Sequence, residues 1–300
     1  MTAENQRANV RRAALSLARI VRAGHRLVVT HGNGPQVGLL ALQGAAYKPD
    51  EAYPLDVLGA ETGGMIGYMI EQELENALDH AQPVATLLTQ VVVDVRDPAF
   101  RNPTKFIGPV YEREEAEARA AAAGWTIAQD GDKWRRVVPS PEPQEIPDMR
   151  VLRLLLDQGV IVICTGGGGI PVLRRDDGSM TGIEAVIDKD AASALLAWQL
   201  EADALLLLTD VDGVYRDFGT DAQTRIAALT PDEAQALDLP AGSMGPKIRA
   251  AAAFARRGGL AGIGRLDQAV DLLARRAGPC VALGMPESPN IPGERSPEDG

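Results

Sequence analysis

The sequence predicts an α/β protein in which a mostly parallel sheet carries helices on both faces. Short apolar runs rich in β-branched residues alternate with helical patterns along the chain. Several of these runs end in glycine-rich segments, and ligand loops of this kind collect at the carboxyl edge of a parallel sheet. The alternation therefore indicates repeated strand and helix units with one edge available for a ligand.

The clearest buried strand covers residues 160–164, a run of four β-branched residues and a cysteine. Four consecutive glycines follow at 166–169, where a backbone without Cβ atoms can approach a ligand closely. After a hairpin at 176–178, Ile187-Asp188-Lys189-Asp190 precedes a helical pattern at 191–200. This arrangement fits either a phosphate site at a helix N-terminus or a tight turn followed by an Asp188 N-cap.

The sequence that precedes the strand at 160–164 predicts a second ligand loop. A helix at 2–22 and a short strand at 27–30 lead into His31-Gly32-Asn33-Gly34-Pro35, with proline at an expected first helical position. His31 is either a general base or, as we expect, a hydrogen-bonded structural residue. The next helix, at 56–78, has several glycines near one face, which fits a dimer seam or a loop over the site.

Residues 95–147 interrupt the periodic pattern and are expected to form a small protruding, lid-like subdomain. The segment contains Asn102-Pro103-Thr104-Lys105, a charged helix at 112–123 and a hairpin at 130–132. Lys105 would be the residue that the lid places over the site, or else a solvated loop lysine. We expect one domain at 1–284 with this insertion, and a disordered tail at 285–300.

The sequence of the C-terminal half of the chain predicts further ligand loops. A buried strand at 204–208 ends in a segment with two carboxylates and a tyrosine at 210–215, which suits a ribose, a magnesium ion, an adenine or a plain Asx-turn. Gly245-Pro246-Lys247 opens a helix that is expected to reach residue 257. The expected order then continues with a strand at 260–263, a helix at 267–275 and a strand at 280–283.

Composition excludes several classes of protein. The formal net charge of −11 argues against a nucleic-acid surface, which needs clustered Lys and Arg. No apolar run reaches the ~18 residues that span a bilayer and no signal peptide is present, so we expect a cytoplasmic protein without a membrane partner. Cys164 and Cys280 lie in apolar runs and are expected to be buried thiols. With only three histidines, the sequence has no zinc-site spacing.

The combination of loops and lysines favours phosphoryl transfer. Only five of the 30 basic residues are lysines, and three of them, Lys105, Lys189 and Lys247, lie beside glycines, prolines or a helix start. A transferring phosphoryl group needs positioned ammonium groups and backbone donors more than a covalent nucleophile. The sequence has no P-loop, no dinucleotide fingerprint after the first strand and no nucleophile elbow.

Six motifs in order closely resemble those of the carbamate kinases, within the amino-acid kinase superfamily. They are His31 to Gly38, Asn102 to Lys105, Thr165 to Pro171, Ile187 to Asp190, Leu208 to Tyr215 and Gly242 to Lys247. The resemblance runs from about Thr2 to Leu283. It implies a three-layer α/β/α sandwich, a homodimer, and reversible phosphoryl transfer between carbamoyl phosphate and MgADP that yields ATP and carbamate, in arginine catabolism.

The resemblance also implies roles for individual residues. Lys189 and Lys247 would stabilise the transferring group, Asp190 would orient the lysines, and Lys105 would reach in from the subdomain. The expected substrate-binding residues are Gly32, Asn33, Gly34, Gly167 and Gly168. The expected nucleotide-binding residues are Asp210, Val211, Asp212, Gly213, Tyr215, Met244 and Gly245. Mg²⁺ would be held mainly by the nucleotide phosphates, without a metal site made by the protein.

One departure from the family pattern concerns the start of the chain. Carbamate kinases open with a strand that ends in a Gly-Gly-Asn phosphate loop, ahead of the helix that here begins at Thr2, and this sequence has no such segment. We expect a truncated start, because the other motif residues are of the required types. The alternatives are a catalytically impaired nucleotide-binding relative, or another amino-acid kinase with a different small acid substrate.

Overall fold

The computed structural model describes residues 3–48, 51–237, 239 and 244–283. The predicted tail at 285–300 and the loop at 241–243 lie outside the described residues. The chain forms two compact units, one made of Arg26–Leu195 and the other of Met1–His25 with Leu196–Gly300. Each unit is described by itself.

The Arg26–Leu195 unit is built around a parallel sheet with the order β1-β7-β2. Its members are β1 (Val28–Val29), β7 (Ile161–Ile163) and β2 (Val84–Thr86). All three residues of β7 are buried, which confirms the strand predicted at 160–164 in its centre. Two helices, α3 (Leu55–Ala77) and α5 (Met149–Asp157), pack against this sheet.

A second sheet of the same unit has the order β3-β8-β9. Strand β3 (Gln90–Val92) pairs parallel with β8 (Ile170–Arg174), and β9 (Met180–Gly182) returns antiparallel to β8. The β8–β9 pair confirms the hairpin predicted at 176–178. The segment after β9 then leads into α6 (Lys189–Gln199).

The glycines of α3 allow close packing, as predicted, but within the unit. A Cβ atom on Gly67 would lie 2.3 Å from the Thr86 side chain of β2. A Cβ atom on Gly166, in the turn after β7, would lie 3.3 Å from Gly63 Cα. Since such contacts leave no room for a side chain, these glycines set how near the helix lies to the sheet and to the turn.

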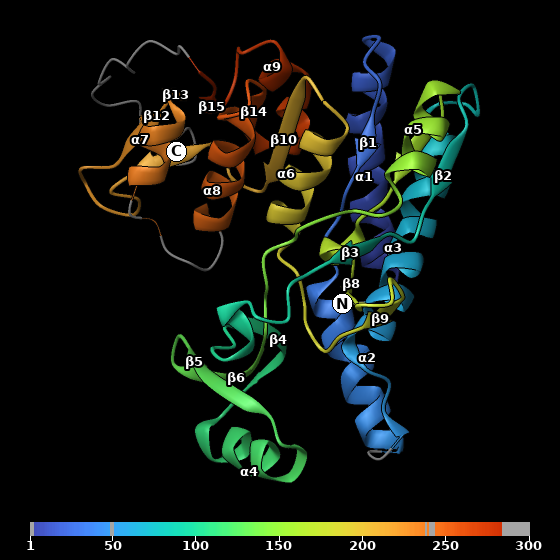
Figure 1. The fold of residues 1–300 in the computed structure, drawn as a ribbon. Helices are drawn as coiled ribbons and strands as arrows, with labels where there is room; N and C mark the ends of the chain where they lie inside the picture. The colour runs from blue at the N-terminus through green and yellow to red at the C-terminus, as the bar shows by residue number, and fades with distance from the viewer. Residues whose placement is uncertain (1–2, 49–50, 238, 240–243, 284–300) are drawn as a thin grey trace. The chain divides into compact units, whose positions relative to one another are not determined.

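The segment predicted as a protruding subdomain has a small antiparallel sheet of its own, with the order β4-β6-β5. Its elements are β4 (Lys105–Tyr111), α4 (Arg113–Ala123), β5 (Thr126–Asp130) and β6 (Lys133–Val138). Gly124 ends α4 in the left-handed conformation, with φ 65°, as its sequence position predicts. Figure 1 shows this helix and its strands in green.

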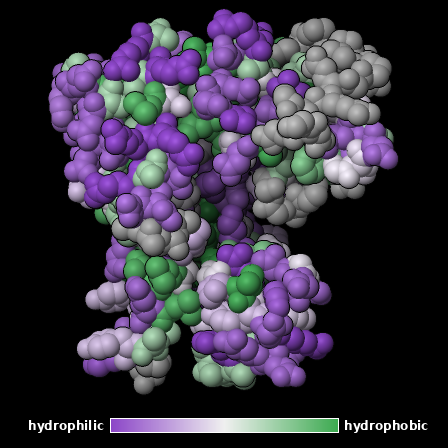
Figure 2. All heavy atoms as spheres, turned by 180° about the vertical axis from the view of Figure 1, so that it is seen from behind, coloured by the Kyte–Doolittle hydropathy of each residue, from purple (hydrophilic) through white to green (hydrophobic). Residues whose placement is uncertain are grey.

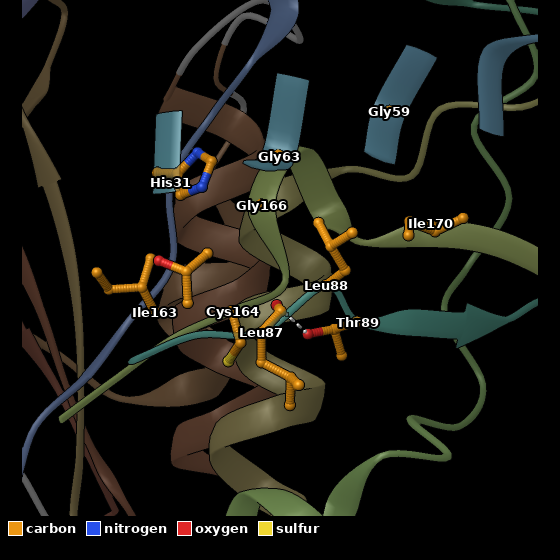
Figure 3. Close-up of a pocket in the computed structure, with 11 residues that line it drawn as sticks. His31, Gly59, Gly63, Leu87, Leu88, Thr89, Ile163, Cys164, Gly166 and Ile170 are labelled. Carbon is orange, nitrogen blue, oxygen red and sulfur yellow. Dashed lines mark hydrogen bonds between the residues drawn. The ribbon is translucent and has the colours of Figure 1, made fainter. Parts of the chain in front are cut away.

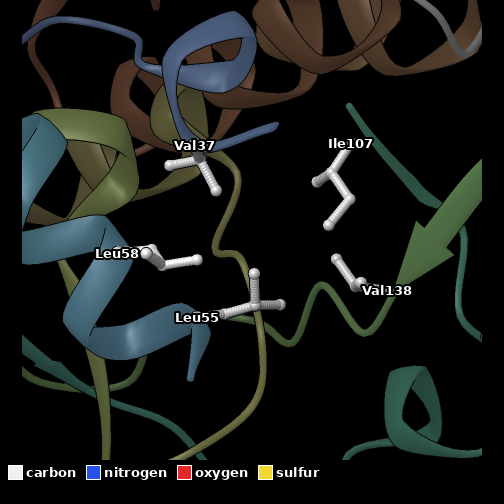
Figure 4. Packing of buried hydrophobic residues seen from close by; sticks show 5 residues of the cluster. All are labelled: Val37, Leu55, Leu58, Ile107 and Val138. Atoms are coloured by element: carbon white, nitrogen blue, oxygen red, sulfur yellow. The ribbon is translucent and has the colours of Figure 1, made fainter. Parts of the chain in front are cut away.

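The subdomain packs on α2 (Gly34–Tyr47) through an apolar cluster. Figure 4 shows Val37, Leu55 and Leu58 facing Ile107 and Val138 of the subdomain. All five side chains are buried, so this cluster forms the hydrophobic contact between the subdomain and helices α2 and α3.

The other unit has a sheet with the order β10-β14-β15-β13, in which β10 (Ala204–Thr209) and β14 (Leu260–Arg265) run parallel over six residues. The shorter strands are β15 (Cys280–Val281) and β13 (Ala228–Leu229). A separate hairpin pairs β11 (Val214–Arg216) with β12 (Thr224–Ile226). The strands predicted at 204–208 and 260–263 are therefore confirmed, each slightly longer than expected.

Helices cover this sheet. Both α8 (Met244–Ala255) and α9 (Ala269–Leu273) contact β10 and β14, and α1 (Ala3–Arg22) contacts α9. A short helix, α7 (Pro231–Ala236), begins with a capping box between Thr230 and Glu233. Cys280 of this unit, and Cys164 of the other, are buried free thiols, as predicted.

The side of the molecule seen in Figure 2 is mostly hydrophilic, with hydrophobic residues in small groups. Among the described residues, no helix is both long enough and apolar enough to cross a lipid bilayer.

Candidate active site

The start of α6 organises the candidate site of the Arg26–Leu195 unit. Asp188 lies just before the helix, and its Oδ1 accepts hydrogen bonds from the amides of Asp190 (2.9 Å) and Ala191 (3.2 Å). These bonds confirm the predicted N-cap and satisfy two amides that have no partner within the helix. The helix N-terminus thus carries Lys189 and Asp190 in its first turn.

The Lys189 side chain lies between the Asp190 carboxylate and the backbone of Gly32. Its Nζ donates to Asp190 Oδ1 at 2.8 Å, and the Asp190 side chain is only 8% exposed. A Cβ atom on Gly32 would lie 3.2 Å from Lys189 Cδ, so the loop after β1 passes directly along the lysine side chain. Ser193 links the two elements, because its hydroxyl donates to the Lys189 carbonyl and contacts Thr30 Oγ1 at 2.8 Å.

Asn33 is fixed in the same loop. It is 5% exposed, and its Nδ2 donates to Thr62 Oγ1 of α3 at 2.9 Å. Thr62 in turn donates to the Leu58 carbonyl at 2.8 Å. A Cβ atom on Gly167 would lie 2.1 Å from Asn33 Nδ2, so only glycine can occupy this position.

The glycine-rich turn after β7 packs against both neighbouring loops. The amide of Gly167 donates to the His31 carbonyl at 2.7 Å, and a Cβ atom on Gly168 would lie 2.4 Å from the Ile187 carbonyl oxygen. Gly167 and Gly168 have φ values of 67° and 95°. The bare backbone predicted at 166–169 therefore brings the loop of Asn33 and the start of α6 together.

A cavity of about 10 Å³ lies behind this turn, lined by His31, Gly63, Thr89, Cys164 and neighbouring residues. Figure 3 shows the His31 ring beside Gly63 and Gly166. Burial lowers the pKa of His31, which favours the neutral ring, while the contact of Nδ1 with the Gly32 carbonyl at 3.2 Å acts in the opposite direction. This environment fits the structural role that we expected for His31.

Lys105, the first residue of β4, extends from the subdomain to the start of α6. Its Nζ donates to Asp188 Oδ2 at 2.7 Å, across 83 positions of sequence. Burial alone would raise the pKa of the Asp188 carboxyl. The Lys105 ammonium and the hydrogen bonds to that carboxyl have the larger combined effect, so the pKa lies below its ordinary value. Lys105 is therefore an ion-paired residue beside the site rather than a solvated loop lysine.

The expected nucleotide-binding segment follows β10 in the other unit. Asp212 is its centre, because Oδ1 accepts a hydrogen bond from the Tyr215 hydroxyl at 2.8 Å and Oδ2 lies 3.8 Å from Arg225 Nε. Burial and the bond to Asp212 raise the pKa of Tyr215. Gly213 is buried against Arg225 and Pro279, whereas Asp210 is exposed at the strand end and Val211 is half-buried.

The start of α8 carries the other expected residues of this unit. Met244 is half-buried, Gly245 is buried, and Lys247 is 8% exposed in the first turn. Lys247 and Lys189 belong to different compact units.

The structure thus brings together Gly32, Asn33, Gly34, Gly167, Gly168, Lys189, Asp190 and Lys105. Sequence reasoning missed the contribution of Thr62, Glu184 and Arg225, whose partners lie 29, 129 and 13 positions away in the sequence. In the sequence, Asp188 and Asp190 flank Lys189, and two carboxylates beside one lysine indicate more than a helix N-cap. Among the described residues, no group of three or more His, Cys, Asp and Glu side chains could hold a metal ion.

Comparison with known proteins identifies relatives over most of the chain. A model of the Amino acid kinase family matches residues 1–263. A carbamate kinase of Haemophilus influenzae is 56% identical over 279 residues, covering 93% of this chain and 90% of the relative. A carbamate kinase of Escherichia coli K12 is 52% identical over 284 residues, covering 94% of each protein.

Solved structures give the same result. The carbamate kinase of Giardia lamblia bound to citric acid is 41% identical with a TM-score of 0.87, and its complex with AMP-PNP is 40% identical with a TM-score of 0.85. Each alignment covers 94% of this chain and 92% of the other. These neighbours, together with the mostly parallel sheets, confirm the predicted α/β fold class.

Proposed function

Since the chain belongs to the amino acid kinase family, and within it to the carbamate kinases, we propose that it transfers a phosphoryl group reversibly between carbamoyl phosphate and MgADP, giving ATP and carbamate. The observation that carries the proposal for the site is the placement of Lys189. Its ammonium stands at the N-terminus of α6, paired with the buried Asp190 and flanked by the bare backbone of Gly32.

Lys189 supplies positive charge to the transferring group. The group carries negative charge on its equatorial oxygens as it moves, and a positioned ammonium stabilises that charge without reorganisation. Asp190 fixes the direction of the lysine, since its Oδ1 accepts a hydrogen bond from the ammonium and its own side chain is buried. The positive end of the α6 dipole adds to the same field.

The loop of Asn33 and the turn at Gly167 and Gly168 bind carbamoyl phosphate in this proposal. Both loops present backbone without side chains, which allows an anion to approach the backbone closely. Asn33 is held by Thr62 and has no freedom to swing, so it provides a fixed polar contact for the carbamoyl end.

The nucleotide binds to Asp210, Val211, Asp212, Gly213, Tyr215, Met244 and Gly245. Tyr215 and Asp212 are joined by a hydrogen bond, and this pair gives a fixed polar surface for the nucleotide. Lys247 at the start of α8 provides the second ammonium for the transferring group. The magnesium ion enters as part of MgADP, held mainly by the phosphates. The AMP-PNP complex of the Giardia relative supports this nucleotide class.

The proposal also covers cellular location, pathway, domain organisation and assembly. The protein acts in the cytoplasm in arginine catabolism, and residues 95–147 form a lid-like insertion in a single kinase domain at 1–284. It is also a homodimer, for which the exposed side of α3 is a suitable surface: Val57, Met65 and Tyr68 recur there at helical spacing and are 36%, 39% and 53% exposed. Sedimentation equilibrium measures the assembly directly.

The test of the activity is ATP formation from carbamoyl phosphate and MgADP by the 300-residue chain. We expect turnover that Lys189→Ala lowers by about 10²–10³-fold, the usual cost of removing one donor to a transition-state anion. Lys48→Ala is the control, because Lys48 pairs with Glu51 on the surface. Turnover that is unchanged in Lys189→Ala would reject the assigned site, and binding of ADP without turnover would favour an impaired relative.

A further inference from the structure

Two carboxylates in the segment between β9 and α6 connect the subdomain to helix starts in the same way. Glu184 Oε2 accepts a hydrogen bond from the Leu55 amide, at the start of α3, while Oε1 lies 3.5 Å from Arg136 of β6. Asp188 Oδ1 accepts from the first amides of α6, while Oδ2 accepts from Lys105 of β4. Each carboxylate thus uses one oxygen for a helix and the other for a subdomain cation.

The two connections differ in which helix they reach. Glu184 joins the subdomain to α3, and Arg136 is further held by stacking over the Trp125 ring, with 5.0 Å from its Cζ to the ring centroid. Asp188 joins the subdomain to α6 and is the immediate neighbour of Lys189. The Lys105 ammonium is therefore fixed at the helix turn that carries the proposed catalytic lysine.

We propose that Asp188 is the positioning residue for Lys105: its Oδ2 holds the ammonium of the subdomain at the N-terminus of α6, ready to meet the transferring phosphoryl group. This inference rests on the proposed function. It assigns to Asp188 a task in the reaction besides capping a helix. The two tasks use different oxygens of one carboxylate and can be separated by substitution.

Geometry and exposure both suit this task. A lysine side chain is long and flexible, so an ammonium ordered before the substrate arrives loses less conformational entropy during the reaction. The pair is only partly buried, with 34% of the Lys105 side chain and 24% of the Asp188 side chain exposed. The ammonium has three donors, so it can bond Asp188 and still donate to an incoming anion.

A double-mutant cycle between Asp188→Asn and Lys105→Ala tests the proposal. In Asp188→Asn the side-chain carbonyl still caps α6, but the amide that replaces Oδ2 cannot accept from the ammonium. We expect Asp188→Asn to lower kcat/KM for carbamoyl phosphate by about tenfold in the wild-type background and by less than about twofold in Lys105→Ala, since contacting residues are coupled. Circular dichroism should show a cooperative unfolding transition in each variant.

Glu184→Gln is the matched control. It makes the same change of carboxylate to amide at the other connection and retains an oxygen for the Leu55 amide. Its effect should be the same with and without Lys105. If Asp188→Asn lacks a cooperative transition, Asp188→Ser replaces it, because serine caps a helix but cannot reach Lys105.

The possible results distinguish a failure of the positioning role of Asp188 from a failure of the proposed activity. Equal losses from Asp188→Asn in both backgrounds, or no loss in either, would overturn the positioning role while leaving the proposed activity intact. A wild-type chain that forms no ATP from carbamoyl phosphate and MgADP would reject the proposed function itself.

Discussion

Gly38 of α2 and Gly108 of β4 touch backbone to backbone. A Cβ atom on Gly38 would lie 2.3 Å from Gly108 Cα and 2.5 Å from its amide nitrogen. Gly108 itself has φ 71°, a conformation that side chains rarely allow. The subdomain therefore rests on the helix that follows the Asn33 loop at a distance that only glycine permits.

We predict that Gly38→Ala displaces the subdomain from α2. Overpacking of this kind costs about 1–3 kcal/mol in the free energy of unfolding, and the shift of Lys105 should also lower kcat/KM for carbamoyl phosphate. Urea denaturation and steady-state kinetics measure the two effects. The control is Gly44→Ala on the same helix, where a Cβ atom would meet Ala52 at an ordinary 3.8 Å. Equal stability of the two variants would contradict the packing argument.

We predict that Thr62→Val loosens Asn33. The substitution keeps the shape of the side chain but removes the oxygen that accepts from Asn33 Nδ2, leaving a buried amide without its partner. The free energy of unfolding should fall by about 1–3 kcal/mol. Thr62→Ser, which retains the hydroxyl, should preserve more of the activity than Thr62→Val. Identical kinetics in both variants would mean that the bond does not position Asn33.

The secondary structure was predictable from the sequence because its signals are local. The apolar run at 160–164, the glycine after α4 and the hairpin after β8 each depend on a few adjacent residues. The strand ends were less predictable. The run predicted at 280–283 forms only β15, Cys280–Val281, since hydrogen bonding to neighbouring strands decides where a strand ends.

The site was predictable only in part, for the same physical reason. Lys189, Asp190 and Asn33 belong to short motifs, so the sequence and the family resemblance indicate them directly. The contact between Lys105 and Asp188 spans 83 positions, and that between Asn33 and Thr62 spans 29. Such partners are chosen by the folded chain, and neither threonine in a helix nor aspartate at an N-cap is unusual by itself.

We predict that Asp188 contributes to stability only above acidic pH. The pKa of its carboxyl is lowered in the folded protein from the ordinary value of 3.8, so its contribution is complete above that value and is lost as the pH falls through the folded-state pKa. Unfolding temperatures of wild type and Asp188→Asn should differ at neutral pH and converge in acid. A difference that stays constant down to the acid limit would contradict the prediction.

We predict that both cysteines resist thiol reagents until the protein unfolds. Cys164 and Cys280 are 2% and 4% exposed, and burial raises the pKa of the Cys164 thiol to about 11. The reactive thiolate of Cys164 is then about one part in a thousand at pH 8, besides being inaccessible. Labelling with a disulfide reagent should be slow for the native chain and reach both thiols in denaturant. Rapid labelling of either thiol in the native protein would contradict the prediction and show that the region around β7 or β15 opens.

The central claim is that Lys189, paired with the buried Asp190, acts on the transferring phosphoryl group. The most direct measurement is a crystal structure of the protein with MgADP and an aluminium fluoride that mimics the transferring group. The account predicts that Lys189 Nζ lies within about 3 Å of a fluoride ligand. A fully occupied complex in which the Lys189 ammonium points away from the fluoride would contradict it.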